Sequence, residues 1–185
     1  MKRLWITGYR SYELGIFNDK DPKLKVINQV IKQNLIQAIE SGVDWIITGP
    51  QLGIEQLSVQ QAVKLKQKYP NEFKVAVMSP FKNVQKRWNQ NNKLKLSKII
   101  QNADFADSVS HKEYNSPSQL INYQRFMLSH TDEAIMIYDP DHEGKSKYDY
   151  HRIKTYSEQR DYPFKIIDFD DLQEAANEYE ENLKK

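Results

Sequence analysis

The residues best suited to chemistry lie in one turn, from Thr48 to Glu55, with the sequence Thr-Gly-Pro-Gln-Leu-Gly-Ile-Glu. The turn follows a short β-branched run and precedes a stretch with helical periodicity, which predicts a strand, a tight loop and a helix. Glycine at positions 49 and 53 allows a positive φ or a close approach of the backbone to a ligand. A helix that begins beside Gly53 would direct free N–H groups at an anion, and at phosphate above all.

Two charged side chains, Glu55 in this turn and Arg10 after an earlier strand, each have two interpretations. Glu55 lies in the first turn of the expected helix, where an acid complements the helix dipole without any further role. A carboxylate there would repel phosphate, however, so it also suits a ribose hydroxyl, a base amino group or acid–base catalysis. Arg10 is either an exposed loop arginine or a bidentate partner for phosphate or carboxylate. The sequence leaves both choices open.

The elements that must position these residues alternate between strand and helix about six times. We expect strands at residues 4–8, 45–49, 74–80, 105–109, 133–138 and 164–167, and helices at residues 22–42, 54–69, 83–102, 117–129, 150–160 and 170–183. This order predicts an α/β fold, with a Rossmann-like, doubly wound and mostly parallel sheet covered by helices on both faces. No linker of domain-separating length interrupts it, so we expect a single domain over residues 1–185.

Ligands of such sheets bind at the carboxyl ends of the strands, where the strand order reverses. The polar strand ends should therefore lie along one edge: Thr7-Gly8-Tyr9-Arg10, Thr48-Gly49-Pro50-Gln51, Ser79-Pro80-Phe81 and Asp139-Pro140. Aromatic side chains that could stack on a base are Tyr9, Trp88, Tyr123 and Tyr148, although most aromatic residues of such a chain belong to the core.

Composition and missing motifs narrow the function. The absence of cysteine excludes disulfides and thiolate metal sites, and the histidines show no metal-binding spacing, so we predict no metal. Neither G-x-G-x-x-G, G-x-x-x-x-G-K-[ST] nor G-x-S-x-G occurs. The first residues do not resemble a signal peptide and no run is long enough to span a membrane, so we expect a cytoplasmic protein without a membrane partner.

Four segments together resemble the YpsA family of bacterial proteins: Thr7 to Arg10, Thr48 to Glu55, Asn115 to Gln119 and Gly144 to Tyr148. That family belongs to the SLOG superfamily, together with DprA and the LOG phosphoribohydrolases. The resemblance implies a Rossmann-like fold that binds a nucleotide or a nucleotide-derived molecule. Residues 49–55 are similar to the Gly-rich turn of DprA. Residues 140–150, by contrast, have one glycine and lack the glutamate of the LOG loop.

The resemblance also implies a pocket in which Gln124 and the segment from Gly144 to Tyr148 face the turn, with Arg10 alongside. The expected ligand-binding residues are Thr7, Gly8, Tyr9, Arg10, Thr48, Gly49, Pro50, Gln51, Gly53, Glu55, Gln124, Gly144, Ser146, Lys147 and Tyr148. The leading hypothesis is a sensor or regulator with phosphate or ribose at the turn, and members of the family have been linked to growth and cell division.

Two alternatives come from other classes of protein. One is a nucleotide hydrolase or N-glycosidase in which Glu55 is the catalytic acid or base. The other is DprA-like nucleic-acid binding by the basic residues between Lys82 and Lys98, against which the net charge of only +2 argues. The identity of the ligand, the oligomeric state and any protein partner are left open by the sequence.

Overall fold

The apolar strand β1 (Arg3–Gly8) lies inside a six-stranded sheet, between β2 (Trp45–Thr48) and β5 (Glu133–Ile137). The computed structural model describes all residues from 1 to 185. The other strands are β3 (Lys74–Ser79), β4 (Phe105–Ser108) and β6 (Phe164–Ile167), and the order across the sheet is β4-β3-β2-β1-β5-β6. Every neighbouring pair is parallel, which confirms the predicted fold class.

The direction in which the chain crosses the sheet changes once. From β1 the chain moves outward through β2 and β3 to β4, and it then returns to the other side of β1 to form β5 and β6. The loops that follow β1 and β5 therefore diverge at their carboxyl ends. This divergence leaves a crevice above the junction of the two strands, which is where open α/β sheets bind ligands.

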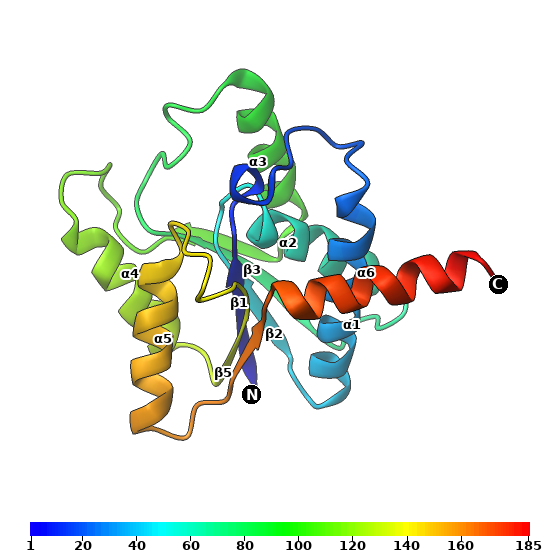
Figure 1. Cartoon of the computed structure of the whole chain (residues 1–185). Coiled ribbons are helices and arrows are strands. Elements are labelled where there is room, and N and C mark those ends of the chain that lie inside the picture. The colour runs from blue at the N-terminus through cyan, green and yellow to red at the C-terminus, as the bar shows by residue number, and fades with distance from the viewer.

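Helices cover both faces of the sheet (Figure 1). One face carries α1 (Lys23–Glu40), α2 (Ile54–Leu65) and α3 (Gln90–Asn102), and the other carries α4 (Ser118–Ser129) and α5 (Lys147–Gln159), which lie side by side. The last helix, α6 (Phe169–Leu183), packs against α1, and a short 3₁₀ turn, η1 (Ser11–Leu14), follows β1. None of these helices has the length and apolar character needed to cross a membrane.

The core consists of the strands and the helix faces turned toward them. Leu4, Trp5 and Ile6 of β1 are completely buried, and Ile46 of β2 and Met136 of β5 beside them are buried as well. Strands buried on both faces are continuous apolar runs rather than alternating ones, because helices shield each side. The polar residues that end these runs are thus held at the edge of a rigid layer.

Three helix boundaries differ from the sequence prediction by three residues or more. The helix expected over residues 83–102 begins only at Gln90, because the side chain of Asn89 accepts a hydrogen bond from Asn92 N and caps it, while Asn83 has a φ of 57° that a helix does not allow. The helix expected to reach residue 69 ends at Leu65 and continues as turns.

The third difference changes the candidate site. The helix expected to begin at residue 150 begins at Lys147, so α5 includes Lys147 and Tyr148, which the sequence had placed in a loop. The same shift brings Asp149 into the first turn of α5, on the edge of the sheet where ligands bind.

Candidate functional site

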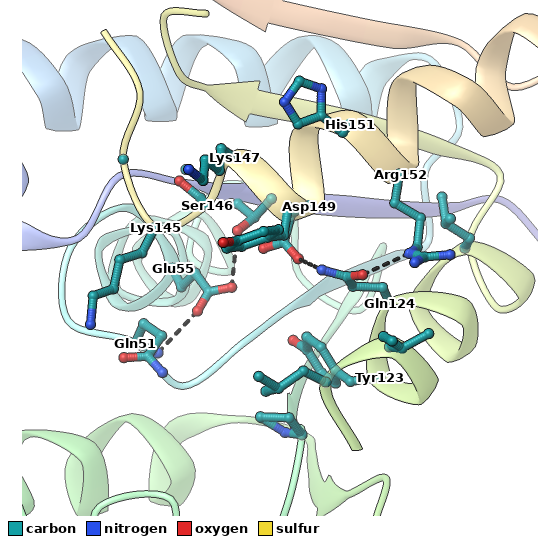
Figure 2. Close-up of a pocket in the computed structure, with 18 of the residues that line it drawn as sticks. Gln51, Glu55, Tyr123, Gln124, Lys145, Ser146, Lys147, Asp149, His151 and Arg152 are labelled. Atoms are coloured by element: carbon teal, nitrogen blue, oxygen red, sulfur yellow. Dashed lines mark hydrogen bonds between the residues drawn. The ribbon is translucent and has the colours of Figure 1, made fainter. Parts of the chain in front are cut away.

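Glu55 is a buried acid whose carboxylate bonds to the turn after β2. It is the second residue of α2 and is only 6% exposed. Its carboxylate accepts a hydrogen bond from Thr7 Oγ1 at 3.0 Å and another from Gln51 N at 3.0 Å (Figure 2). Thr7 lies at the carboxyl end of β1 and Gln51 in the loop after β2, so Glu55 joins the end of one strand to the loop that follows the other.

Three backbone N–H groups at this turn are not free to bind an anion. Gln51 N donates to Glu55, Ile54 N donates to Tyr9 O at 3.0 Å, and Gln56 N donates to Gln51 O at 3.2 Å. Gly53, with a φ of 118°, lets the backbone approach that of Arg10, with which it forms an isolated antiparallel bridge. The group that this turn presents is a carboxyl group, and three of the N–H groups expected to bind phosphate already have partners within the protein.

A second acid, Asp149, reaches the same place from the other half of the sheet. Its Oδ1 accepts a hydrogen bond from Gln124 Nε2 at 2.7 Å, and Gln124 Oε1 accepts one from Arg152 Nε at 2.7 Å (Figure 2). Because a guanidinium group can only donate, it fixes which end of the Gln124 amide faces Asp149. Arg152 thus acts through Gln124 to hold Asp149 in place. Asp149 is not among the residues expected from the sequence, and the signal that points to it is its place as the acid in the first turn of α5, a helix that begins earlier than expected.

The pKa values of both acids lie above their usual range. Burial, followed by the charge of Asp149, raises the pKa of Glu55 to about 7, against the opposing effects of Gln51 N, Thr7 and Arg10. Burial raises the pKa of Asp149 to about 6, although the hydrogen bond from Gln124 and the charges of Arg10 and Arg152 act in the opposite direction. Both groups can therefore take up or release a proton close to neutral pH.

Tyr123 of α4 completes this polar group. Its side chain is 7% exposed, and its hydroxyl group has no hydrogen-bond partner within the protein. Burial raises the pKa of Tyr123 well above its usual value, and the charges of Glu55 and Asp149 raise it further, so the hydroxyl group keeps its proton. A buried donor without a partner is costly and is usually satisfied by water or by a ligand.

A pocket with a volume of about 1800 Å³ extends from these residues. One wall is aromatic and contains Phe81, Trp88 and Tyr114, of which Phe81 and Tyr114 have ring centroids 5.2 Å apart. Positively charged side chains surround the remainder: Arg10, Arg125, Lys145, Lys147, Arg152 and Arg160. The pocket thus combines a carboxyl floor, an aromatic wall and a basic surround.

Most of the expected ligand-binding residues line this pocket. They are Thr7, Gly8, Arg10, Pro50, Gln51, Glu55, Gln124, Gly144, Ser146, Lys147 and Tyr148. Gln124 and residues 144–148 thus line the same pocket as Pro50, Gln51 and Glu55 of the turn. Of the aromatic residues considered for stacking on a base, Trp88, Tyr123 and Tyr148 also line the pocket.

Four expected residues lie behind the pocket instead. The ring of Tyr9 is 3% exposed and stacks on Phe169 at a centroid distance of 5.3 Å, while its hydroxyl group donates to His142 O at 2.6 Å and accepts from Asp139 N at 3.0 Å. Tyr9 therefore fastens the loop after β5 and is not available to stack on a base. The burial of its ring by residues far along the chain is not visible in the sequence.

The other three support the turn. Thr48 Oγ1 donates to Ile6 O at 2.6 Å and so links β2 to β1. Gly49 lies against the carboxylate of Glu55, and Gly53 lies against the backbone of Tyr9 and Ser11. No group of three or more histidine, aspartate and glutamate side chains converges in a way that could hold a metal ion.

The sheet and the position of this pocket define the class of protein. An all-parallel sheet that reverses its strand order beside β1, with a pocket over the junction, is a Rossmann-like α/β arrangement. The chain belongs to the YpsA family, since residues 4–172 match the model of that family, which is described as the YspA SLOG family.

Several bacterial proteins are similar over the whole length of the chain. A UPF0398 protein of Levilactobacillus brevis is 53% identical over 182 residues, which cover 98% of this chain and 96% of the relative. UPF0398 proteins of Lactobacillus gasseri and Lactobacillus johnsonii are 53% and 52% identical, and the matched residues cover 98% and 100% of this chain and 96% and 98% of the relatives.

Proposed function

We propose that this protein binds a nucleotide or a nucleotide-derived ligand in the pocket over β1 and β5 and acts as a sensor or regulator in the cytoplasm. The observation that carries the proposal is the pair of acids at the floor of the pocket, the buried Glu55 and the half-buried Asp149, together with the aromatic wall and the basic surroundings. Each of these three surfaces suits one part of a nucleotide.

The floor suits the sugar or the base edge. A carboxylate accepts hydrogen bonds, and the hydroxyl groups of ribose and the amino group of a base are donors. Phosphate would be repelled by a carboxylate at the same place. We therefore assign the turn from Thr48 to Glu55 to the ribose or the base, and the phosphate to the arginine and lysine side chains of the surround.

The aromatic wall suits a planar base. Trp88, Phe81 and Tyr114 are only partly buried, so their rings are available to a ligand. Stacking of a base on an aromatic side chain contributes about 1–3 kcal/mol per base. Trp88 gives the largest ring surface of the three.

A thermal-shift and calorimetric screen of nucleoside monophosphates, ADP-ribose and NAD tests the proposal. A compound at a hundred times its dissociation constant should raise the free energy of unfolding by about 2.7 kcal/mol. The increase should be lost in Glu55→Gln and kept in Glu72→Gln, since Glu72 is an exposed acid outside the pocket. The proposal fails if no compound binds, or if both variants bind equally well.

One observation favours a second candidate, a nucleotide hydrolase or N-glycosidase. The pKa of Glu55 is about 7, which is the range in which a general acid or base works best at neutral pH. Turnover of a nucleoside monophosphate or of ADP-ribose should then disappear in Glu55→Gln while binding is retained. Binding without turnover in the wild-type protein would leave the sensor as the better description.

A further inference from the structure

The pocket is larger than a mononucleotide requires. Its volume of about 1800 Å³ exceeds the roughly 300–1,000 Å³ of ordinary small-molecule pockets. Part of this volume lies along α4 and α5, because residues of both helices line it: Arg125, Leu128 and Ser129 on α4, and Arg152, Thr155, Tyr156 and Gln159 on α5, followed by Arg160. Figure 1 shows these two helices running alongside each other away from the carboxyl edge of the sheet.

Arginine is concentrated around this pocket. The chain has six arginine residues, and four of them line it: Arg10, Arg125, Arg152 and Arg160. None of the four forms an ion pair with a carboxylate within 4.0 Å. By contrast, Arg3, which lies outside the pocket, is paired with Asp132. Arginine is the side chain best suited to phosphate, because its guanidinium group can bind two oxygens at once.

The acids that line the pocket form no ion pair with these arginines, and only Arg10 and Arg152 lie close enough to act on the pKa of an acid at the floor. Glu13 accepts hydrogen bonds from Arg10 N and Lys145 N, and Glu143 pairs with Lys147. Glu55 and Asp149 are at the floor, beyond which the groove between α4 and α5 is lined by no acid at all. The positive charges of Arg125 and Arg160, farther along the groove, are therefore not balanced by an acid that lines the pocket.

The arginines are spread along the groove and do not cluster at one point. Asp149 lies in the first turn of α5, and Arg160 follows its last residue, so the two are separated by about 16 Å along the helix axis at 1.5 Å per residue. Arg152 lies between them on α5, and Arg125 faces the groove from α4. A ligand that meets both the acids and Arg160 must be long and must carry negative charge at more than one point.

We propose that the ligand of this pocket is an extended nucleotide, with one nucleoside at Glu55 and Asp149 and a further phosphate-bearing part along Arg125, Arg152 and Arg160. This inference rests on the proposed function and names the chemical class of its ligand. The extension is joined to the first nucleoside either through a pyrophosphate or through a phosphodiester, and both linkages place phosphate beside the arginines.

Isothermal titration calorimetry with three probes tests the proposal: adenosine monophosphate, NAD, which has a pyrophosphate link, and the 5′-phosphorylated diadenylate, which has a phosphodiester link. At least one extended probe should bind ten times more tightly than adenosine monophosphate. The ratio of the dissociation constant of adenosine monophosphate to that of the extended probe should fall toward one in the double variant Arg125→Gln/Arg160→Gln. The same ratio should fall as the salt concentration is raised. Whichever extended probe binds more tightly identifies the linkage.

The matched control is Arg87→Gln, because Arg87 is an exposed arginine that does not line the pocket. This variant should bind the extended probe more tightly than adenosine monophosphate by the same factor as the wild-type protein does. The inference is overturned if adenosine monophosphate binds as tightly as both extended probes, or if the double variant keeps the advantage. If none of the three probes binds, the proposed function itself is overturned and the inference falls with it.

Discussion

The carboxylate of Glu55 occupies the space beside Gly49 that a larger side chain would need. A Cβ atom at position 49 would lie 2.5 Å from Glu55 Oε2 and 2.6 Å from Oε1. The glycine is therefore required by packing and not by an unusual φ, and it determines where the acid can lie.

This contact predicts coupling between the two residues. Gly49→Ala should lower the free energy of unfolding by about 1–3 kcal/mol, because an added methyl group must displace the carboxylate. Glu55→Ala removes the obstacle, so the double variant should lose less than the sum of the two single changes. Urea denaturation of the four proteins measures the coupling, and strictly additive losses would show that the two residues do not compete for space.

The raised pKa of Glu55 predicts that the stability depends on pH. In the unfolded chain Glu55 has a pKa near 4.5, and in the folded protein it is about 7, so between these values the folded state binds more protons. The free energy of unfolding should therefore decrease as pH rises from about 4.5 to 7. The contribution is at most about 3.5 kcal/mol, since one pKa unit corresponds to about 1.4 kcal/mol.

Glu55→Gln should remove this part of the pH dependence, because the amide stays neutral and can still bond to Thr7 and Gln51 N. Asp149, whose pKa is about 6, contributes in the same direction and should keep part of the slope in the variant. The comparison is made by chemical denaturation at a series of pH values. A wild-type protein that becomes steadily more stable over this range would contradict the raised pKa.

The order of hydrogen bonds from Arg152 through Gln124 to Asp149 predicts the effect of breaking it. Gln124→Met keeps the approximate volume but removes the donor to Asp149, so the pKa of Asp149 should rise further. Carboxyl ¹³C NMR titration measures this shift. Gln119→Met is the matched control, since Gln119 is an equally buried glutamine that bonds to Ser110 and Glu113 O and does not contact Asp149.

The hydroxyl group of Tyr9 predicts a structural effect at the loop after β5. Tyr9→Phe removes its hydrogen bonds with Asp139 and His142 but leaves the ring on Phe169. The free energy of unfolding should fall by about 1–3 kcal/mol, because Asp139 N is left without its partner. Hydrogen exchange should become faster at residues 139–144, and unchanged exchange there would show that the loop does not depend on Tyr9.

The sequence predicted the sheet well because buried parallel strands are recognisable by composition. Runs such as Trp45-Ile46-Ile47 are apolar throughout, and proline, glycine and polar residues mark where they end. The turn with Glu55 is also predictable from the sequence, for a different reason. Its two glycines and its acid are close together in the chain, so local rules describe them.

The remainder of the site depends on contacts between distant residues. Asp149 is held by Gln124, 25 residues earlier, and Gln124 is oriented by Arg152, 28 residues later. No local pattern shows that these three meet. Tyr9 shows the converse. Its position at a strand end predicts a ligand contact, but its hydroxyl group bonds instead to Asp139 and His142, which are 130 and 133 residues away.

The position of β1 between two strands from opposite parts of the chain also has a consequence for biosynthesis. β2 follows soon after β1, but β5 pairs with it only much later, and the contact between Arg3 N and Asp132 that begins this pairing spans 129 residues. While the ribosome makes the intervening chain, the β5-facing edge of β1, with Leu4, Trp5 and Ile6, has no partner within the molecule. Such an apolar open edge can pair with other chains, so the interval before β5 emerges is when the nascent protein is most exposed to aggregation and most in need of a chaperone.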